Sequence, residues 1–111
     1  MDSITKHKQI VKQILDEVMP KNPKTSIQSV RIEDDVRGHY LLYNDGWRGE
    51  SRIYGCFLHI EVKADGKVWL QHDGTDMIVG QMLLDAGVPK SQLVLGFQAP
   101  IVRADTGLAV A

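Results

Sequence analysis

The sequence predicts an α+β fold, a two-layer sandwich in which two helices cover one face of a β-sheet. Three observations predict it. Apolar residues near the N-terminus recur with the period of a helix, four runs with strand character follow across short turns, and the helical period returns after Asp73-Gly74. Strands joined by short turns pair as an antiparallel meander. The expected order is therefore an N-terminal helix, an antiparallel four-strand meander, a second helix and a final strand.

The 111 residues suit a single domain, 1–111, with a modest hydrophobic core. The formal net charge is −1, so no strong field would draw the chain to DNA or to an anionic membrane. With one cysteine, no signal peptide and no apolar run long enough to cross a bilayer, the chain is expected to be cytoplasmic. Cys56 is predicted to face the core from the middle of a strand rather than act as a reactive thiol.

The first helix is predicted from Ile4 to Val18, with Ser3 as its N-cap and His7 one turn before the apolar stripe. It ends at Met19-Pro20, because the residue before a proline avoids the α region. A short linker follows at residues 21–26. The buried stripe is expected to consist of Ile10, Val11, Ile14, Leu15 and Val18.

The first two strands are predicted at Ile27–Glu33 and His39–Tyr43, with Val30 and Ile32 sharing one face of the first strand. Asn44-Asp45-Gly46 is a tight-turn signal, so the residues after it should lead into the next strand, Arg52–Val62.

A hairpin is predicted around Asp65-Gly66, and two registers are open. A two-residue loop would place Val62 opposite Trp69, whereas a type I turn with Gly66 as a G1 bulge would place Val62 opposite Val68. We favour the bulged turn, because it sorts apolar and polar side chains onto separate faces.

Thr75 is the expected N-cap of the second helix, and Gly87 its C′ residue. Leu93–Phe97 should then form an apolar strand that is central in the sheet or parallel to its neighbour. Residues 99–111 are moderately apolar and are predicted to pack on the domain or on a partner. The buried stripe of the second helix is expected to consist of Ile78, Val79, Met82, Leu83 and Ala86.

No residues have the spacing of a catalytic centre. His59 and His72 are predicted to lie on opposite faces of the hairpin, where they could not share a metal ion, and neither H-E-x-x-H nor C-x-x-C occurs. The glycines fit no phosphate-binding motif. Five aspartates stand where turns need a side chain that accepts bonds from backbone amides: Asp34, Asp35, Asp45, Asp65 and Asp73. We expect no catalytic residue, no cofactor and no metal.

Trp47, Arg48 and Arg52 form the one cluster with the character of an interaction site. An aromatic side chain beside arginines can anchor a protein partner or stack on a nucleobase. In the alternative interpretation, Trp47 covers the end of the sheet and the arginines are solvated.

The chain resembles the XisI family, small cyanobacterial proteins named as fdxN element excision controlling factors. The likeness runs from the KQIVKQIL helix to the end of the chain, and is carried by RIYGCFLHIEVKADGKVWLQHDGT, DAGVPKSQLVLGFQAP and VRADTGLAVA. The resemblance implies a small two-layer α+β fold. It also implies a role, with a companion protein called XisH, in controlling the site-specific excision of a DNA element during heterocyst development. It implies no catalytic residues, because the recombinase is a separate protein.

The first hypothesis is therefore a non-enzymatic accessory factor that acts through an XisH-like protein partner, since a chain without a basic surface is poorly suited to bind DNA alone. The alternative is a direct DNA-binding module that uses Trp47, Arg48 and Arg52. A small enzyme is a third hypothesis. A homodimer formed through the apolar tail or a sheet edge is also expected, and association with a membrane is not.

Overall fold

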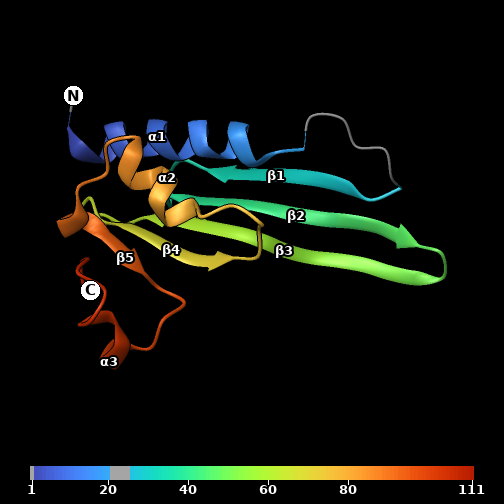
Figure 1. Cartoon of the computed structure of the whole chain (residues 1–111). Helices are drawn as coiled ribbons and strands as arrows, with labels where there is room; N and C mark the ends of the chain where they lie inside the picture. The colour runs from blue at the N-terminus through green and yellow to red at the C-terminus, as the bar shows by residue number, and fades with distance from the viewer. Residues whose placement is uncertain (1, 21–25) are drawn as a thin grey trace.

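The computed structural model describes residues 2–20 and 26–111, so nearly all of the predicted linker lies outside the described residues. One five-stranded sheet runs in the order β1-β2-β3-β4-β5 (Figure 1). The first four strands are antiparallel neighbours, and β4 and β5 are parallel. This confirms the predicted α+β class and the meander. The elements are α1 (Ser3–Val18), β1 (Gln28–Asp34), β2 (His39–Arg48), β3 (Ser51–Val62), β4 (Val68–Asp73), α2 (Val79–Asp85), the short 3-10 helix η1 (Lys90–Gln92), β5 (Leu93–Leu95) and α3 (Pro100–Arg103).

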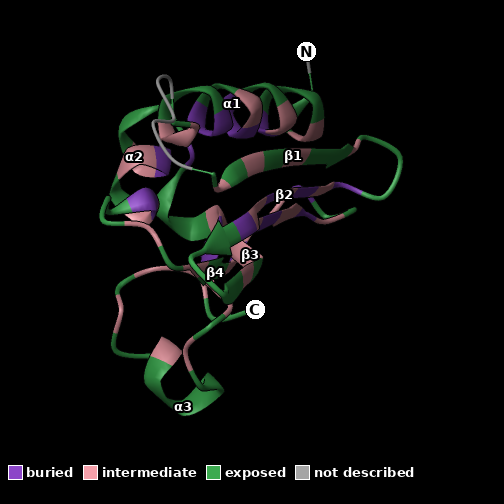
Figure 2. Ribbon diagram, turned by 90° about the vertical axis from the view of Figure 1, so that its right-hand side faces the viewer, coloured by how far each residue is buried: buried purple, intermediate pink, exposed green. Residues whose placement is uncertain are grey.

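The hydrophobic core lies between the sheet and the helices α1 and α2, on what we call the inner face of the sheet; the other side is the outer face. In Figure 2 the buried residues of α1 lie on its side toward the strands, whereas α3 stands apart and is largely exposed. Within the described strands, β2, β3, β4 and β5 supply buried side chains to this core, and β1 supplies none. The core residues are Ile10, Val11, Ile14, Leu15, Tyr40, Leu42, Leu58, Ile60, Val62, Val68, Leu70, Val79, Leu83, Val88 and Leu93.

Helix α1 begins one residue earlier than predicted. The carboxylate of Asp2 accepts a hydrogen bond from the Thr5 amide at 2.8 Å, so Asp2 is the N-cap and Ser3 is already helical. His7 is buried and its Nδ1 donates to the carbonyl oxygen of Gly66 at 2.6 Å. This bond ties α1 to the turn between β3 and β4.

The predicted bulged turn between β3 and β4 is confirmed. Val62 lies opposite Val68, the Lys63 amide donates to the Lys67 carbonyl at 2.9 Å, and Gly66 has a φ of 89°. A residue with a side chain adopts such a φ only with strain. The local turn chemistry therefore set the register that the apolar pattern favoured.

The hairpin between β2 and β3 is longer than predicted. Strand β2 runs through the expected turn at residues 44–46 to Arg48, which lies opposite Ser51. Gly46 serves a close approach rather than a turn, because a Cβ there would lie 2.4 Å from the Ser26 carbonyl oxygen. The turn falls instead at Gly49, which has a φ of 61°.

The prediction that Cys56 faces the core is wrong. Leu42 lies opposite Leu58 but Tyr43 lies opposite Cys56, so Phe57 is an additional residue in β3. The bulge shifts Cys56 to the outer face beside Tyr43, where it is half-buried. Burial raises the pKa of the Cys56 thiol. A protonated, half-buried thiol is a poor nucleophile, in keeping with the expectation that it is unreactive.

Helix α2 begins at Val79 with no side-chain cap, so Thr75 is not its N-cap. Thr75 instead accepts from the Met77 amide at 3.2 Å, and Asp73 accepts from the Val79 amide at 3.3 Å, which organises the turn before the helix. Ile78 is therefore outside α2 and exposed, contrary to the predicted stripe.

The end of α2 is as predicted. The Val88 amide donates to the Leu83 carbonyl at 3.0 Å, Gly87 has a φ of 117°, and Val88 is buried. Strand β5 then pairs in parallel with β4, which confirms one of the two alternatives predicted for this strand. Phe97, which was predicted to belong to the strand, lies outside it.

The C-terminal residues pack on the domain, which confirms the prediction for 99–111. Ala109 forms a parallel bridge with Val94 along the free side of β5, and Leu108 packs against the core. Lys67 donates from its ammonium to the carbonyl oxygen of Ala111.

Candidate protein-interaction surface

The protruding end of the β2–β3 hairpin carries an exposed stack of an arginine between two aromatic rings. The guanidinium carbon of Arg52 lies 5.5 Å from the ring centroid of Trp47 and 4.8 Å from that of Tyr54. These distances allow cation–π attraction on both sides. Trp47 and Tyr54 remain 52% and 65% exposed. We call Trp47, Arg52 and Tyr54 the hairpin cluster.

Two further contacts hold Arg52 in this position. Its Nη2 pairs with the carboxylate of Asp45 at 2.9 Å, and its Nη1 donates to the Gly46 carbonyl at 3.1 Å. Tyr43 extends the row of rings, with its centroid 6.0 Å from that of Tyr54. The arginine is thus ordered before any partner arrives, which lowers the entropic cost of binding through it.

The structure brings together two of the three residues singled out in the sequence. Trp47 lies opposite Arg52 on adjacent strands, whereas Arg48 lies opposite Ser51 and, by strand alternation, points to the other side of the hairpin. No ion pair or ring contact joins Arg48 to another described residue. Tyr54 was missed, although the period of two that places it on the face of Arg52 is visible in the sequence.

The outer face of β1, β2 and β3 is not covered by any helix of the described residues. Val30 and Ile32 of β1 lie there opposite Tyr43 and Leu41 of β2, and both are exposed. In the first predicted strand these two residues do share a face, but the face turned toward α1 is that of Ser29 and Arg31. The apolar side of β1 is therefore available at the surface.

Three histidines lie close together on the same outer face, which corrects the prediction that His59 and His72 are on opposite faces. His59 lies opposite His72 because Gln71 is an additional residue in β4. His39 Nδ1 lies 3.0 Å from His59 Nε2, and His39 Nε2 lies 3.8 Å from the Glu61 carboxylate. Burial, and after it the neighbouring His39, lower the pKa of His59. Among the described residues, no three His, Cys, Asp or Glu side chains are arranged to hold a metal ion.

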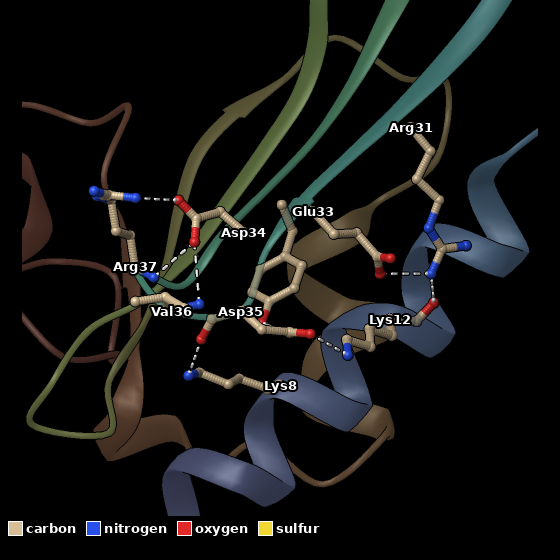
Figure 3. A network of polar contacts seen from close by, with 9 residues as sticks. Lys8, Lys12, Arg31, Glu33, Asp34, Asp35, Val36 and Arg37 are labelled. Atoms are coloured by element: carbon tan, nitrogen blue, oxygen red, sulfur yellow. Dashed lines mark hydrogen bonds and ion pairs between the residues drawn. The ribbon is translucent and has the colours of Figure 1, made fainter.

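A network of polar contacts joins the turn between β1 and β2 to helix α1 (Figure 3). Lys12 pairs with the Asp35 carboxylate at 2.9 Å, and Lys8 donates to the Asp35 carbonyl at 2.6 Å. Asp34 accepts from the amides of Val36 and Arg37 at 3.0 and 2.9 Å, which is the turn role predicted for it. These carboxylates are occupied by structural contacts.

A groove of about 410 Å³ lies between α2, β5 and the C-terminal segment. Its walls are mostly apolar, including Leu70, Leu84 and Leu95, and Lys90 also lines it. The Asp73 carboxylate in the groove already accepts hydrogen bonds from Thr75.

Trp69, the second tryptophan, lies under the C-terminal segment. Lys63 Nζ lies 4.1 Å from the centroid of its ring, and the guanidinium carbon of Arg103 lies 5.0 Å from a centroid of the same indole. Its indole nitrogen is buried with no hydrogen-bond partner among the described residues. None of the helices in the described part of the chain has the length and apolar character required to span a bilayer.

The profile of the XisI family, described as XisI protein, matches residues 1–110 of this chain. The chain belongs to the XisI family. No curated protein sequence matches it. Among solved structures, it is similar to a XisI-like protein from Anabaena variabilis ATCC 29413, with 37% sequence identity, a TM-score of 0.88, and coverage of 97% of this chain and 99% of the other.

A second similar structure is named as the fdxN element excision controlling factor XisI, also from Anabaena variabilis ATCC 29413. The identity is 28% and the TM-score 0.84, with 99% of this chain and 100% of that chain covered. XisI family membership thus extends over the whole described fold, including the β2–β3 hairpin.

Proposed function

We propose that this protein is a non-enzymatic accessory factor of the cytoplasm that controls the site-specific excision of a DNA element by binding an XisH-like protein. The excision-controlling role is supported by family membership and by the name of the similar Anabaena variabilis structure. The role of a protein partner is supported by the hairpin cluster, which is exposed and already ordered.

The composition of the hairpin cluster favours a protein partner. Tryptophan, tyrosine and arginine are the residues that most often carry the binding energy of protein–protein interfaces. Trp47 and Tyr54 present rigid rings, and Asp45 holds Arg52 between them. A partner that buries these rings gains apolar contact without having to order the arginine.

Direct binding of DNA is less well supported. Each phosphate contact draws on a lysine or arginine, and the formal net charge is −1. Arg52 is already paired with Asp45, which leaves Arg48 as the unpaired cation of the hairpin among the described residues. The alternative role of Trp47, Arg48 and Arg52 as a DNA contact would therefore rest mainly on Arg48.

Alanine substitutions in the hairpin test the proposal. Trp47→Ala and Arg52→Ala should each raise the dissociation constant of the complex with a cognate XisH-like protein by about tenfold or more, since each removes part of the stack. Arg48→Ala is the matched control, because it removes an exposed arginine of the same hairpin that lies outside the stack. Calorimetry on the purified proteins gives the constants, and circular dichroism checks that each variant is folded.

Two outcomes would contradict the proposal. The absence of a complex between the wild-type protein and the XisH-like protein would remove the partner. Salt-dependent binding to duplex DNA that Arg48→Ala weakens, together with no effect of Trp47→Ala or Arg52→Ala on the protein complex, would instead favour the DNA-binding alternative.

A further inference from the structure

Strand β1 is an open edge of the sheet within the described residues. It pairs with β2 alone, in a register that is unbroken from Gln28 to Asp34. At the opposite edge, β5 is bridged by Ala109. Proline, lysine, a bulge and very short length commonly block natural edge strands, and β1, with the sequence QSVRIED, has none of these; its inward-directed Arg31 bonds to α1. An open edge of this kind can accept another strand.

We propose that β1 pairs with β1 of a second copy of this chain, antiparallel about a two-fold axis at Arg31, so that one sheet runs through a homodimer. This inference does not depend on the proposed function. It selects the sheet edge over the C-terminal segment, because that segment already packs on β5 of its own chain.

The register about Arg31 is self-complementary. It places Val30 opposite Ile32 of the second copy, and Ile32 opposite Val30, on the uncovered outer face. Val30 and Ile32 are 36% and 45% exposed in the single chain, and Leu41 and Tyr43 flank them on β2. In the dimer, the exposed apolar side chains of the two copies would contact each other and would be partly buried by that contact.

The polar residues of β1 also match in this register. Gln28 lies opposite Asp34 of the second copy, and Ser29 lies opposite Glu33, so that polar side chains oppose polar side chains. A two-fold axis at Val30 would instead place Ile32 opposite Gln28, and one at Ile32 would place Val30 opposite Asp34. Both alternatives set an apolar side chain against a polar one.

The two copies of Arg31 face each other in this arrangement, and their charges are already balanced. Arg31 pairs with Asp16 of α1 and, at 3.1 Å, with Glu33, and it donates to the Lys12 carbonyl at 3.2 Å. The guanidinium is therefore drawn toward α1 and away from the edge. Glu33 of the second copy would be its diagonal cross-strand neighbour, within reach of a long side chain.

Sedimentation of the full chain over a range of concentrations tests the dimer. The wild-type protein should sediment as a dimer, and Val30→Lys with Ile32→Lys should raise the dimer dissociation constant by about a hundredfold or more, because lysines at an edge oppose pairing. Val36→Lys is the matched control, since Val36 is 89% exposed in the β1–β2 turn and outside the strand. Trp47→Ala should leave the dimer intact, which separates this surface from the hairpin cluster. A wild-type monomer, or equal effects of the edge and control variants, would overturn the proposal.

Cysteine cross-linking tests the register. In a Cys56→Ser background, a mixture of Val30→Cys and Ile32→Cys chains should form a disulfide between unlike chains under mild oxidation, because directly opposed Cβ atoms lie close to bonding distance. Each variant alone should cross-link far less. Efficient cross-linking of Val30→Cys with itself, or of Ile32→Cys with itself, would overturn the register about Arg31.

Discussion

Tyr40 is the residue through which the β1–β2 turn is tied to the core. Its ring is fully buried on the inner face, and its hydroxyl donates to the Asp35 carboxylate at 2.6 Å. The bond from Tyr40, and after it the bond from Lys12, lower the pKa of Asp35. Burial, and then the bond to Asp35, raise the pKa of Tyr40. The hydroxyl therefore remains a donor and Asp35 remains an acceptor at neutral pH.

Tyr40→Phe should lower the free energy of unfolding by about 1–2 kcal/mol at neutral pH, because it removes a hydrogen bond to a carboxylate while keeping the ring in place. Urea denaturation measures the loss. Tyr54→Phe, on an exposed ring, is the control and should change stability by less than about 0.5 kcal/mol. Equal stabilities of the wild type and Tyr40→Phe would show that the bond to Asp35 makes no net contribution.

His59 should make stability depend on pH in the neutral range. The unfolded chain binds a proton at the ordinary pKa of 6.5, whereas burial and His39 lower the pKa in the folded protein. The contribution of His59 to the free energy of unfolding is therefore fully present above pH 6.5. It is lost as the pH falls through the lowered pKa of His59 in the folded protein. The groups that face it are His39, Glu61 and His72.

The free energy of unfolding should thus decrease as the pH falls below 6.5, and the decrease should be smaller in His59→Gln. Chemical denaturation at several pH values measures both slopes. Asp34 and Asp35 do not interfere, because their lowered pKa values act below their ordinary value of 3.8. Identical slopes in the two proteins would contradict the role of His59.

At the scale of the element, turns and bulges set the registers, and they differ in how far a sequence reveals them. The β3–β4 turn was predictable because its chemistry is local: Asp65 accepts from the Lys67 amide at 3.0 Å, and Gly66 supplies the positive φ. The bulges at Phe57 and Gln71 have no such local signal, because each depends on how a strand meets its neighbour. The predicted faces of Cys56 and His72 were wrong for this reason.

Gly38 shows how closely the β1–β2 turn fits the rest of the sheet. It has a φ of 77°, and its carbonyl accepts from the Val62 amide at 2.8 Å. A Cβ at this position would lie 2.2 Å from the Val62 carbonyl oxygen, which is a backbone atom and cannot move aside alone. The turn and the end of β3 therefore fit together only with glycine here.

Gly38→Ala should lower the free energy of unfolding by about 3 kcal/mol or more, since it adds a backbone clash to the strain of a positive φ. Gly49→Ala is the matched control. Gly49 has a φ of 61°, but apart from its chain neighbours no atom lies within 4 Å of the place that a Cβ would take, so the cost should be about 1 kcal/mol. Thermal unfolding compares the two variants, and equal losses would rule out the clash as the cause.

At the scale of the whole molecule, the sequence predicted the layer arrangement well, because apolar periodicity and short turns leave few ways to bury the two helical stripes. The candidate surfaces were predicted less completely. Trp47 and Arg52 were singled out, but their stack with Tyr54 depends on a strand that continues through an apparent turn at Asn44-Asp45-Gly46. The open edge at β1 depends on the order of strands, which no local pattern in the chain specifies.

The hairpin cluster and the edge of β1 are separate surfaces on one sheet. Pairing of β1 with β2 ends at Gln28 opposite Asp45, and Trp47 lies beyond that point. A dimer formed through β1 would therefore leave both hairpin clusters exposed and present two binding sites to a partner. Avidity of that kind strengthens binding only when the partner is itself multivalent.

The positions of the two tryptophans give the protein two built-in optical probes. Trp47 is half exposed in the hairpin cluster, whereas Trp69 contacts Lys63 and Arg103 beneath the C-terminal segment. The emission of Trp47 should respond to a protein that covers the hairpin, and that of Trp69 to release of the C-terminal segment. Replacing either indole with phenylalanine leaves a single emitter, so contact at the hairpin and opening at the far edge of the sheet can be followed separately in solution without an added dye.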